Sequence, residues 1–563
     1  MDNLRLILFF SLAFILLLLW QAWNEDYGPK SVQESAAVST QTQTQSDTQP
    51  VPAVSSGEMP SAPATTGVTA QADASVPAVG GVAPSGSGNT IKVITDLYNI
   101  EIDTQGGNVL STYLNEYPVS VDTPDEKFHL LRPTTPNLFM AQSGLIGSDK
   151  TSAPTHESVY QSEKSTYVMA DGSDTLQVDL VWSNDKGIKV TKRFNFKRGD
   201  YLVKVQHIVE NGSSEAWAGR EYHQLIRSEV VEESSDSQFL YTYTGGAIYS
   251  PEEKFQKISF DDMADAKLDR DIQGGWLAML QHYFVAAWVP AAEQKDHYYS
   301  NVLPNGRYLL GAYTPGVSLA AGQSHTFTTG FVAGPKVQDM LEEIAPGLDL
   351  TVDYGFLTII AQPMFIGLDW LHSVVGNWGW AIIIFTLLLK LALYKLSETS
   401  YRSMANMRKM TPRIQALKDR YGDDKQRLNQ AMMDLYKTEK INPLGGCLPI
   451  LLQIPFFIAL YWVLLESVEL RQAPFILWIQ DLSIKDPYYV LPVIMGVSMF
   501  VQQKLNPAPP DPMQAKIMMS LPFVFTIFFA FFPAGLVLYW VINNILSIAQ
   551  QWYITRQIEN AAN

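Results

Sequence analysis

The sequence predicts a polytopic α-helical membrane protein that carries a large all-β domain. Two observations support this fold class. Long apolar runs are confined to the N-terminus and to the last third of the 563 residues. Between them, apolar and polar residues alternate with a period of two, which is typical of half-buried strands. Because about 20 apolar residues can span a bilayer as a helix, we expect six transmembrane helices and one β-sandwich.

Charge and cysteine content exclude several classes of function. The formal net charge is −16, but the acidic residues lie mostly before residue 355 and the basic ones gather in 395–440. We therefore expect no direct nucleic-acid readout. Cys447 is the only cysteine, so no intrachain disulfide is possible. The sequence contains no P-loop, metal motif or catalytic triad spacing, and we expect a protein that is not an enzyme and has no cofactor or metal.

The N-terminal 89 residues are predicted to form an anchor and a tether. Residues 1–23 are apolar and end in Trp20 and Trp23, without the small residues of a cleavage site. Such a segment is typical of an uncleaved transmembrane helix with an aromatic anchor at the membrane interface. Residues 24–89 consist mostly of Ser, Thr, Gln, Ala, Val, Pro and Gly and cannot bury a core, so we expect a disordered linker.

Residues 90–340 are predicted to form the all-β domain. The segments 176–182 and 188–196 alternate around Asn-Asp-Lys-Gly, which predicts a β-hairpin, and 201–209 predicts the next strand. Seven of the eight histidines lie in this domain or at its edges, but none has metal-type or triad-type spacing. The sequence therefore assigns the domain no chemistry. A glycan-processing enzyme would need convergent carboxylates or histidines, which only a structure can reveal.

The next two segments are predicted to lead into the membrane. Residues 341–373 are apolar but interrupted, which favours an amphipathic helix in the outer interface. Residues 374–396 form the second predicted transmembrane helix, which contains Lys390. A cation at mid-membrane costs roughly 2.5–3.5 kcal/mol on insertion scales, so it usually faces a bundle interior or a wet cavity. The alternative is a lysine that reaches the nearer interface.

Residues 397–442 are predicted to form a basic helical hairpin on the cytoplasmic side, because positive charge favours that side. Apolar positions at helical spacing (Met404, Met407, Ile414, Leu417 and Tyr421) precede Gly422, and a second helix follows Asp424 with Leu428, Met432 and Leu435. These apolar positions form a predicted seam, along which the two helices pack against each other or a partner protein docks. The two interpretations are compatible. The cations expected to form the docking surface are Arg402, Arg408, Lys409, Arg413, Lys418, Arg420, Lys425 and Arg427.

Four more apolar segments complete the predicted topology, with both termini in the cytoplasm and the β domain outside. The expected third to sixth transmembrane helices are 444–465, 488–504, 513–533 and 534–555. They are joined by an outer loop at 466–487 and a cytoplasmic turn at 505–512, and a tail follows at 556–563.

Polar residues inside these helices are the candidate site. Thr386 and Lys390 share one helical face, and Trp540, Asn543, Asn544 and Ser547 form a stripe on the last helix. Gln453, Ser498 and Thr526 lie on the helices between them. No carboxylate is deep enough to pair with Lys390, which favours a hydrated groove. The alternative is interhelical hydrogen bonding worth about 0.6 kcal/mol per contact, which explains the amides better than it explains the lysine.

The C-terminal third resembles the YidC membrane-protein insertase family in its Gram-negative form, which has a first transmembrane anchor and a large periplasmic domain. The order of segments matches over the whole chain. The motifs that carry the resemblance are Gly376–Gly379, Gly422–Gln426, Asn442–Cys447, Val468–Pro474, Asp486–Tyr489, Asp511–Met513 and Gly535–Tyr539.

The resemblance implies a five-helix core with a hydrophilic groove that opens to the cytoplasm and to lipid, and a periplasmic β super-sandwich. The groove arginine of the family corresponds to Lys390, and the groove threonine and aromatic residue to Thr386 and Trp540. Gln453, Thr526, Asn543 and Asn544 complete the expected substrate groove. Lys395 replaces a proline of the relatives, so a kink at that position is not expected, and the short tail makes ribosome contact through the tail doubtful.

The function expected from these features is insertion of nascent membrane proteins into the lipid bilayer of the bacterial inner membrane, without nucleotide hydrolysis. Assistance in folding and assembly of membrane proteins is part of the same expectation. The resemblance implies the Sec translocon, its accessory subunits, targeting factors and the ribosome as partners. The alternative is a secondary transporter or channel in which Lys390 binds an anionic substrate, although we find no paired repeat of the kind such proteins carry.

Overall fold

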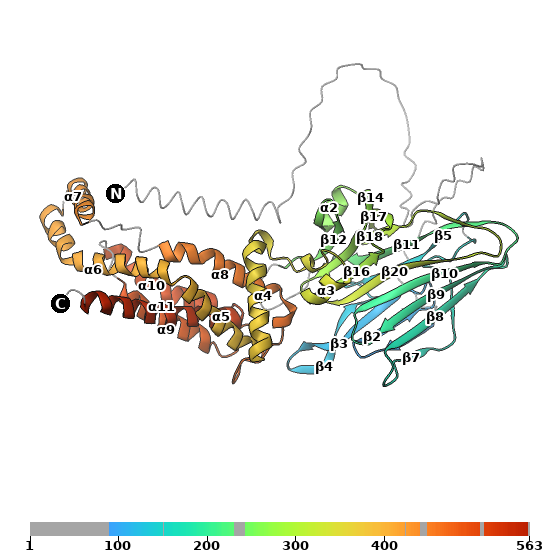
Figure 1. Ribbon diagram of the computed structural model, residues 1–563, viewed down its shortest axis with the longest axis horizontal. Coiled ribbons are helices and arrows are strands. Elements are labelled where there is room, and N and C mark those ends of the chain that lie inside the picture. Colours follow the sequence, from blue (N-terminus) through green and yellow to red (C-terminus); the bar gives the residue numbers. More distant parts are fainter. Residues whose placement is uncertain are drawn as a thin grey trace, which may run out of the picture. The chain divides into compact units, whose positions relative to one another are not determined.

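The computed structural model describes residues 89–149, 151–229, 242–422, 424–439, 448–506 and 512–560 (Figure 1). The predicted first transmembrane helix, most of the linker, the turn at 507–511 and the last three residues lie outside the described part. The chain divides into two compact units, and the described residues up to Val352 form the β unit while those from Asp353 onward form the helical unit. Each unit is considered by itself.

The β unit contains two large sheets, and the prediction of an all-β sandwich is confirmed. Neighbouring strands are antiparallel except for β1 and β7. The first sheet has the order β14 (Asp269–Gln273), β17 (Lys295–Leu303), β18 (Arg307–Tyr313), β11 (Trp217–Ser228), β5 (Phe139–Gly147), β3 (Val109–Ser120), β2 (Tyr98–Asp103), β1 (Thr90–Ile94) and β7 (Thr166–Val168), with β19 (Val317–Leu319) on β11 and β4 (Thr123–Leu131) on β3.

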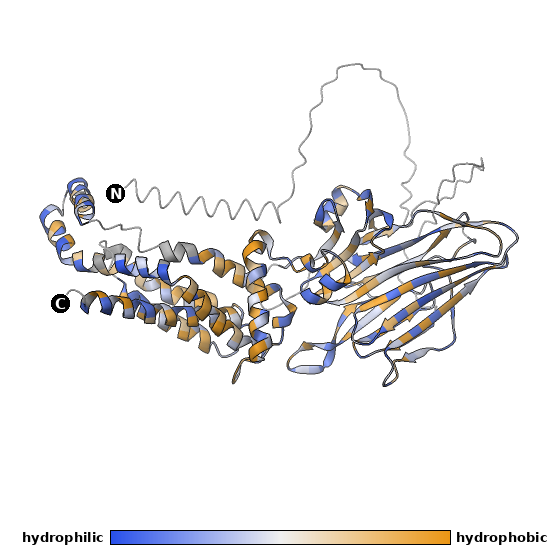
Figure 2. Ribbon diagram, in the orientation of Figure 1, coloured by the Kyte–Doolittle hydropathy of each residue, from blue (hydrophilic) through white to orange (hydrophobic). Residues whose placement is uncertain are grey.

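The second sheet pairs the remaining strands of the described β unit. Its order is β13 (Lys254–Ile258), β12 (Gly245–Ser250), β15 (Trp276–Gln281), β16 (Phe284–Pro290), β20 (Ser324–Pro335), β10 (Leu202–Asn211), β9 (Ile188–Lys197), β8 (Thr175–Ser183) and β6 (Gln161–Ser162). Alternate residues of the strands point into a common core that includes the fully buried Trp276, Trp288 and Phe194. The resulting alternation of hydropathy along the strands is visible in Figure 2.

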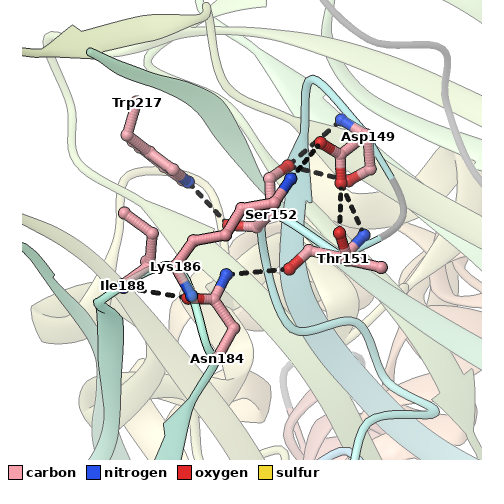
Figure 3. Close-up of polar contacts among 7 residues, drawn as sticks. All are labelled: Asp149, Thr151, Ser152, Asn184, Lys186, Ile188 and Trp217. Atoms are coloured by element: carbon pink, nitrogen blue, oxygen red, sulfur yellow. Dashed lines mark hydrogen bonds and ion pairs between the residues drawn. The ribbon is translucent and has the colours of Figure 1, made fainter. Parts of the chain in front are cut away.

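The predicted hairpin of residues 176–196 is confirmed as β8 and β9, with Trp182 opposite Val190. Asn184 organises the turn, because its side-chain oxygen accepts hydrogen bonds from the backbone N–H groups of Lys186 and Ile188. Its amide also donates to the Thr151 carbonyl, which ties the turn to the loop after β5 (Figure 3). An Asn that bonds the backbone two residues ahead is a strong local turn signal.

The boundary between the units differs from the predicted one. The β unit continues beyond residue 340 through α3 (Gln338–Ile344) and the 3-10 turn Asp349–Thr351. The prediction of one helix across 341–373 is therefore wrong in its first half. Pro346 lacks an N–H donor and Gly347 adopts a left-handed φ of 73°, and both features stop a helix at this point. The helix that follows is α4 (Thr358–Val375), after a 3-10 turn at Gly355–Leu357.

The helical unit is built around α11. This helix packs against α5, α6, α8 and α9, while α4 packs against α5 and α8 and α10 packs against α9. The helices are α5 (Trp378–Ala392), α6 (Tyr394–Tyr421), α7 (Lys425–Thr438), α8 (Leu448–Glu466), α9 (Val490–Leu505), α10 (Pro512–Phe529) and α11 (Ala534–Asn560). The helix α11 continues to Asn560, five residues beyond the predicted sixth transmembrane segment at 534–555.

Two further expectations concern the second predicted transmembrane helix. It does not run to 396, because α5 ends at Ala392 and α6 starts at Tyr394, and residues 378–392 and 397–405 differ in direction by 70°. The expected absence of a kink is therefore wrong, although no proline stands at this position. Within the described residues no single helix meets both the length and the hydropathy needed to cross a membrane, whereas this bent pair meets them together.

The predicted helical hairpin is confirmed as α6 and α7. Gly422 follows α6, and the Asp424 side chain caps α7 by accepting from the Arg427 backbone N–H. The apolar seam differs in part from the predicted one, because Met410 and Tyr436 join it and Met404, Met407 and Tyr421 do not. Its members are Met410, Ile414, Leu417, Leu428, Met432, Leu435 and Tyr436.

Candidate functional site

The polar stripe predicted on the last helix faces three different neighbours. Asn543 of α11 accepts a hydrogen bond from Gln453 of α8. Asn544 donates to Ser498 of α9 at 3.0 Å, and Ser547 accepts from Lys390 of α5 at 2.7 Å. The spacing i, i+1 and i+4 turns these side chains toward different helices on one side of α11. We call Lys390, Gln453, Ser498, Asn543, Asn544 and Ser547 the polar core of the helical unit.

Lys390 lies in the last turn of α5, and its side chain is partly buried. The ammonium has three N–H donors, and Ser547 takes one of them. Among the ion pairs of the described residues, none includes Lys390. The three amides of the polar core are hydrogen-bonded to neighbouring helices, as interhelical contacts would require. Within the described residues, Ser547 is the one hydrogen-bond acceptor of the lysine, which leaves two of its donors for water or a ligand. Interhelical hydrogen bonding therefore accounts for the amides, whereas the hydrated groove around Lys390 stays a prediction.

The other predicted groove residues have local partners. The Thr386 hydroxyl is buried and donates to the Ile382 carbonyl one turn earlier, so it shares the face of Lys390 without a bond to it. The Thr526 hydroxyl donates to Pro522 of its own helix and lies against Gly496 of α9. Trp540 packs edge-on against Phe457 of α8, with ring centroids 4.5 Å apart, and the buried indole N–H has no hydrogen-bond acceptor among the described residues.

One contributor to the polar core escaped sequence analysis. Tyr401 of α6 is buried, and its hydroxyl interacts with Ser547, the acceptor of the lysine. The sequence places Tyr401 in the cytoplasmic hairpin, because it gives no sign of the bend at Leu393. That bend lets α6 pack against α11, and this brings Tyr401 back to the core. The sequence identifies Ser498 and Ser547 as polar positions within apolar helices but does not predict them as members of the groove.

The outward faces of the core helices are apolar. Side chains with more than half of their area exposed include Ile359, Ile366, Trp370 and Val374 on α4, Leu391 on α5, Val493 and Val497 on α9, and Phe523 and Ile527 on α10. Figure 2 shows the apolar colour along these helices. Exposed apolar side chains on several helices of one unit are typical of a membrane or protein interaction site.

The predicted docking cations of the hairpin are partly engaged within the chain. Arg402 pairs with Glu398 at 2.7 Å, Arg427 pairs with Asp424 at 3.2 Å, and Arg413 pairs with Glu439 at 2.6 Å, which joins α6 to the end of α7. The Arg420 guanidinium lies over the Tyr421 ring. The side chains of Arg408 and Lys425 lie outside the described residues. Surface pairs of this kind contribute little to stability and open readily for a partner.

Two family models together match nearly all of the described chain. Residues 90–366 match the model described as the YidC periplasmic domain, and residues 370–561 match the model described as the 60Kd inner membrane protein. The boundary between the two matches falls inside α4.

Curated relatives match over their full length. The chain is 53% identical to the membrane protein insertase YidC of Thioalkalivibrio sulfidiphilus, with 100% of this chain and 99% of the relative covered. It is 51% identical to the protein of the same name from Methylococcus capsulatus, with 99% of each chain covered.

Two solved structures have a more distant likeness. A crystal structure of an active YidC insertase with the first transmembrane domain resolved has a TM-score of 0.38 and 20% identity, and covers 83% of this chain and 93% of that one. A galactose mutarotase related enzyme from Lactobacillus acidophilus has a TM-score of 0.29 and 10% identity, and covers 43% of this chain and 97% of that one. These two likenesses carry no argument about the site.

Proposed function

The chain belongs to the YidC family of membrane protein insertases, and from this premise we propose that it moves nascent membrane proteins into the lipid bilayer without nucleotide hydrolysis. The observation that carries the proposal is the polar core. A lysine with unused donors, surrounded by hydrogen-bonded amides and hydroxyls inside apolar helices, can take the place of water around a polar segment that crosses the membrane.

In this mechanism the polar, often acidic, leader of a nascent protein enters a groove that contains Lys390. The ammonium attracts the carboxylates of the leader, and the remaining polar groups lower its desolvation cost. Lys390 acts as a point charge, because a lysine lacks the planar fork with which arginine binds a carboxylate through two bonds. The apolar segment of the substrate then leaves the groove toward lipid along α8 and α10, which correspond to the third and fifth predicted transmembrane helices.

The same proposal includes a membrane topology. Six transmembrane helices place both termini in the cytoplasm and the β unit in the periplasm of a bacterial inner membrane. The exposed apolar side chains of α4, α5, α9 and α10 support contact with lipid. In this arrangement the short α9 and the proline-containing α10 thin the bilayer locally, which shortens the path of the substrate.

The basic hairpin of α6 and α7 is proposed to receive substrate or its carriers on the cytoplasmic side. Its exposed cations suit an acidic surface, and the seam of Met410 and Met432 allows adaptable packing. The Sec translocon, its accessory subunits, targeting factors and the ribosome are the partners proposed by family membership. Assistance with folding and assembly of membrane proteins belongs to the same role.

Reconstitution in liposomes tests the function. Purified protein should insert a small, single-span substrate with an acidic leader in the absence of ATP, measured as protection of the substrate from added protease. Liposomes that contain the same amount of a Lys390→Ala protein provide the matched control. If the liposomes instead conduct an anionic solute and insert no substrate, the chain is a transporter or channel and the proposal is wrong.

A further inference from the structure

The β unit has a surface cavity that the proposed insertion mechanism does not use. The cavity measures about 550 Å³ and lies over β2, β3 and β4. This volume falls in the range of sites for small ligands, which is roughly 300–1,000 Å³. We call it the β2–β4 cleft.

Three neighbouring strands form the floor of the β2–β4 cleft. Asn99 of β2 lies opposite Tyr113 of β3, and Tyr113 lies opposite His129 of β4, so the three side chains form a row across the sheet. The rings of Tyr113 and His129 are stacked, with centroids 4.1 Å apart and an angle of 13° between their planes. The row lies on the opposite face from the buried Tyr98 and Leu114, and its three side chains are half-buried.

The wall of the cleft arises from irregular pairing between β3 and β4. The register shifts between Leu114 and Pro118 and again between Pro118 and Ser120. Such bulges bend a strand and redirect its side chains, and they are frequent beside binding sites. Asp125 and Glu126 follow on β4 as exposed members of the wall.

The hydrogen-bonding groups of the cleft are held in place but remain available. His129 is fixed by Ser111, whose hydroxyl lies 2.7 Å from its Nε2, and Arg132 Nε donates to the His129 carbonyl at 2.8 Å. The Asn115 amide nitrogen donates to the carbonyls of Thr95 and Asp96, and no hydrogen bond within the described residues occupies its side-chain oxygen. Within the described residues, no hydrogen bond occupies the Asn99 amide, the Tyr113 hydroxyl or the carboxylates of Asp125 and Glu126.

The chemistry of this lining identifies the class of ligand. Two carboxylates are balanced by Lys127 and Arg132, so the cleft does not select a strongly charged molecule. Burial and the nearby Arg132 charge lower the pKa of His129 to about 4, and its ring is therefore neutral at pH 7. Amide, carboxylate and phenol groups together both donate and accept hydrogen bonds, which matches a ligand rich in hydroxyl groups.

An extended peptide fits the cleft less well. Peptides that add to a sheet require a strand with free backbone groups, and their side chains require apolar pockets. Tyr113 of the floor belongs to β3, and at this position the strand is paired with β2 on one side and β4 on the other. Recognition on this floor therefore depends on side chains. We infer that the β2–β4 cleft binds a neutral saccharide of one or two rings.

Ligand titration of the full-length chain tests this inference. The protein is placed in nanodiscs free of maltoside detergent, because a maltoside headgroup would itself occupy the cleft. Maltose, diacetylchitobiose and a hexaalanine peptide are titrated separately, and binding is measured by saturation-transfer NMR and calorimetry. We expect at least one of the two sugars to bind, and we expect Asn99→Ala and Glu126→Ala each to weaken that binding about tenfold, as the loss of one hydrogen bond to a charged or buried group does.

Glu101→Ala is the matched control. Glu101 lies two positions after Asn99 on the same face of β2 but outside the cleft, where it pairs with Lys92 at 3.9 Å. Its replacement should leave sugar binding unchanged. Absence of binding by both sugars, or equal weakening by Glu101→Ala, overturns the inference. If hexaalanine binds while neither sugar does, and if Asn99→Ala and Glu126→Ala abolish that binding, the cleft is a peptide site. This result also overturns the inference.

Discussion

Lys390 and Ser547 are 157 positions apart in the chain, and the lysine Nζ lies 2.7 Å from the serine Oγ. This hydrogen bond joins α5 to α11, the helix that also carries Asn543 and Asn544 of the polar core. Because Ser547 satisfies only one of the three lysine donors, the contact positions the charge without neutralising it.

Replacement of Lys390 tests the role of that charge. Lys390→Ala should reduce insertion of a substrate with an acidic leader about tenfold, whereas Lys390→Arg should retain most of the activity because the charge remains. Insertion is measured by protease protection in liposomes. Lys504→Ala, which removes an exposed lysine at the end of α9, should have little effect. If Lys390→Ala inserts all substrates at the normal rate, the lysine has no role in the groove.

The Gln453–Asn543 contact should stabilise the helical unit modestly. A double-mutant cycle with Gln453→Ala and Asn543→Ala is expected to give a coupling energy of about 0.6 kcal/mol, the average for such contacts inside membrane proteins. The free energy of unfolding is measured in mixed detergent micelles. A coupling energy of zero would show that the two amides do not depend on each other and that water satisfies them separately.

Close packing at Gly496 of α9 predicts a steric effect. A Cβ atom at this position would overlap Thr526 Oγ1 of α10. Gly496→Ala should therefore destabilise the contact between these helices by about 1–3 kcal/mol, as overpacking commonly does. Thr526→Ala removes the overlapping oxygen and should restore part of the loss when the two changes are combined. Thermal unfolding of the four proteins compares these effects, and a combined variant no more stable than Gly496→Ala would contradict the steric explanation.

Buried histidines should make the β unit less stable in acid. Burial lowers the pKa of His223 to about 4, from an ordinary value of 6.5, so the ring stays neutral in the folded state while it gains a proton in the unfolded state. Stability is therefore lost as the pH falls from 6.5 toward 4. The expected loss for this ring is about 2 kcal/mol by pH 5. Burial raises the pKa of Asp296 to about 7, so this carboxyl group binds a proton more tightly in the folded state than in the unfolded state. Its contribution to stability therefore increases as the pH falls below 7, opposite to that of His223.

A single substitution separates these contributions. His223→Gln should weaken the pH dependence of stability between pH 7 and pH 5, while His325→Gln, at a half-buried position near the start of β20, serves as the control. Hydrogen exchange of peptides from the β unit, corrected for intrinsic rates, measures local stability at both pH values. An unchanged pH dependence in His223→Gln would exclude this histidine as a cause of acid sensitivity.

The turn between β8 and β9 provides a test of local stability. Asn184→Ala removes three hydrogen bonds that hold the turn and its neighbouring loop (Figure 3). We expect a loss of about 1–3 kcal/mol in the stability of the β unit, because water can replace the two exposed bonds but not the bond to the N–H of the buried Ile188. Lys186→Ala, which removes an exposed ion pair to Asp149, should cost much less. Pulse proteolysis with denaturant compares the two variants, and equal losses would mean that the charge, not the amide, holds the turn.

Much of the architecture was predictable because local patterns reflect local physics. Alternation with a period of two indicated the sandwich, and Asn184 with Gly187 indicated a particular hairpin. Gly422 and Asp424 marked the break between α6 and α7. Polar residues within apolar helices identified the candidate site, since they are costly there and few in number. Each of these signals depends on residues that are close in the sequence, within about two helical turns or two short neighbouring strands.

Relationships between distant segments required the tertiary structure. The bend at Leu393 has no proline to announce it, and without the bend Tyr401 could not be assigned to the polar core. The stripe on α11 revealed a polar face but not which helix each side chain meets. Likewise, the row of Asn99, Tyr113 and His129 exists only because three strands pair in one register. Sequence periodicity determines which face of an element is polar or buried, whereas packing of complete elements decides which faces meet, and that choice depends on the whole chain at once.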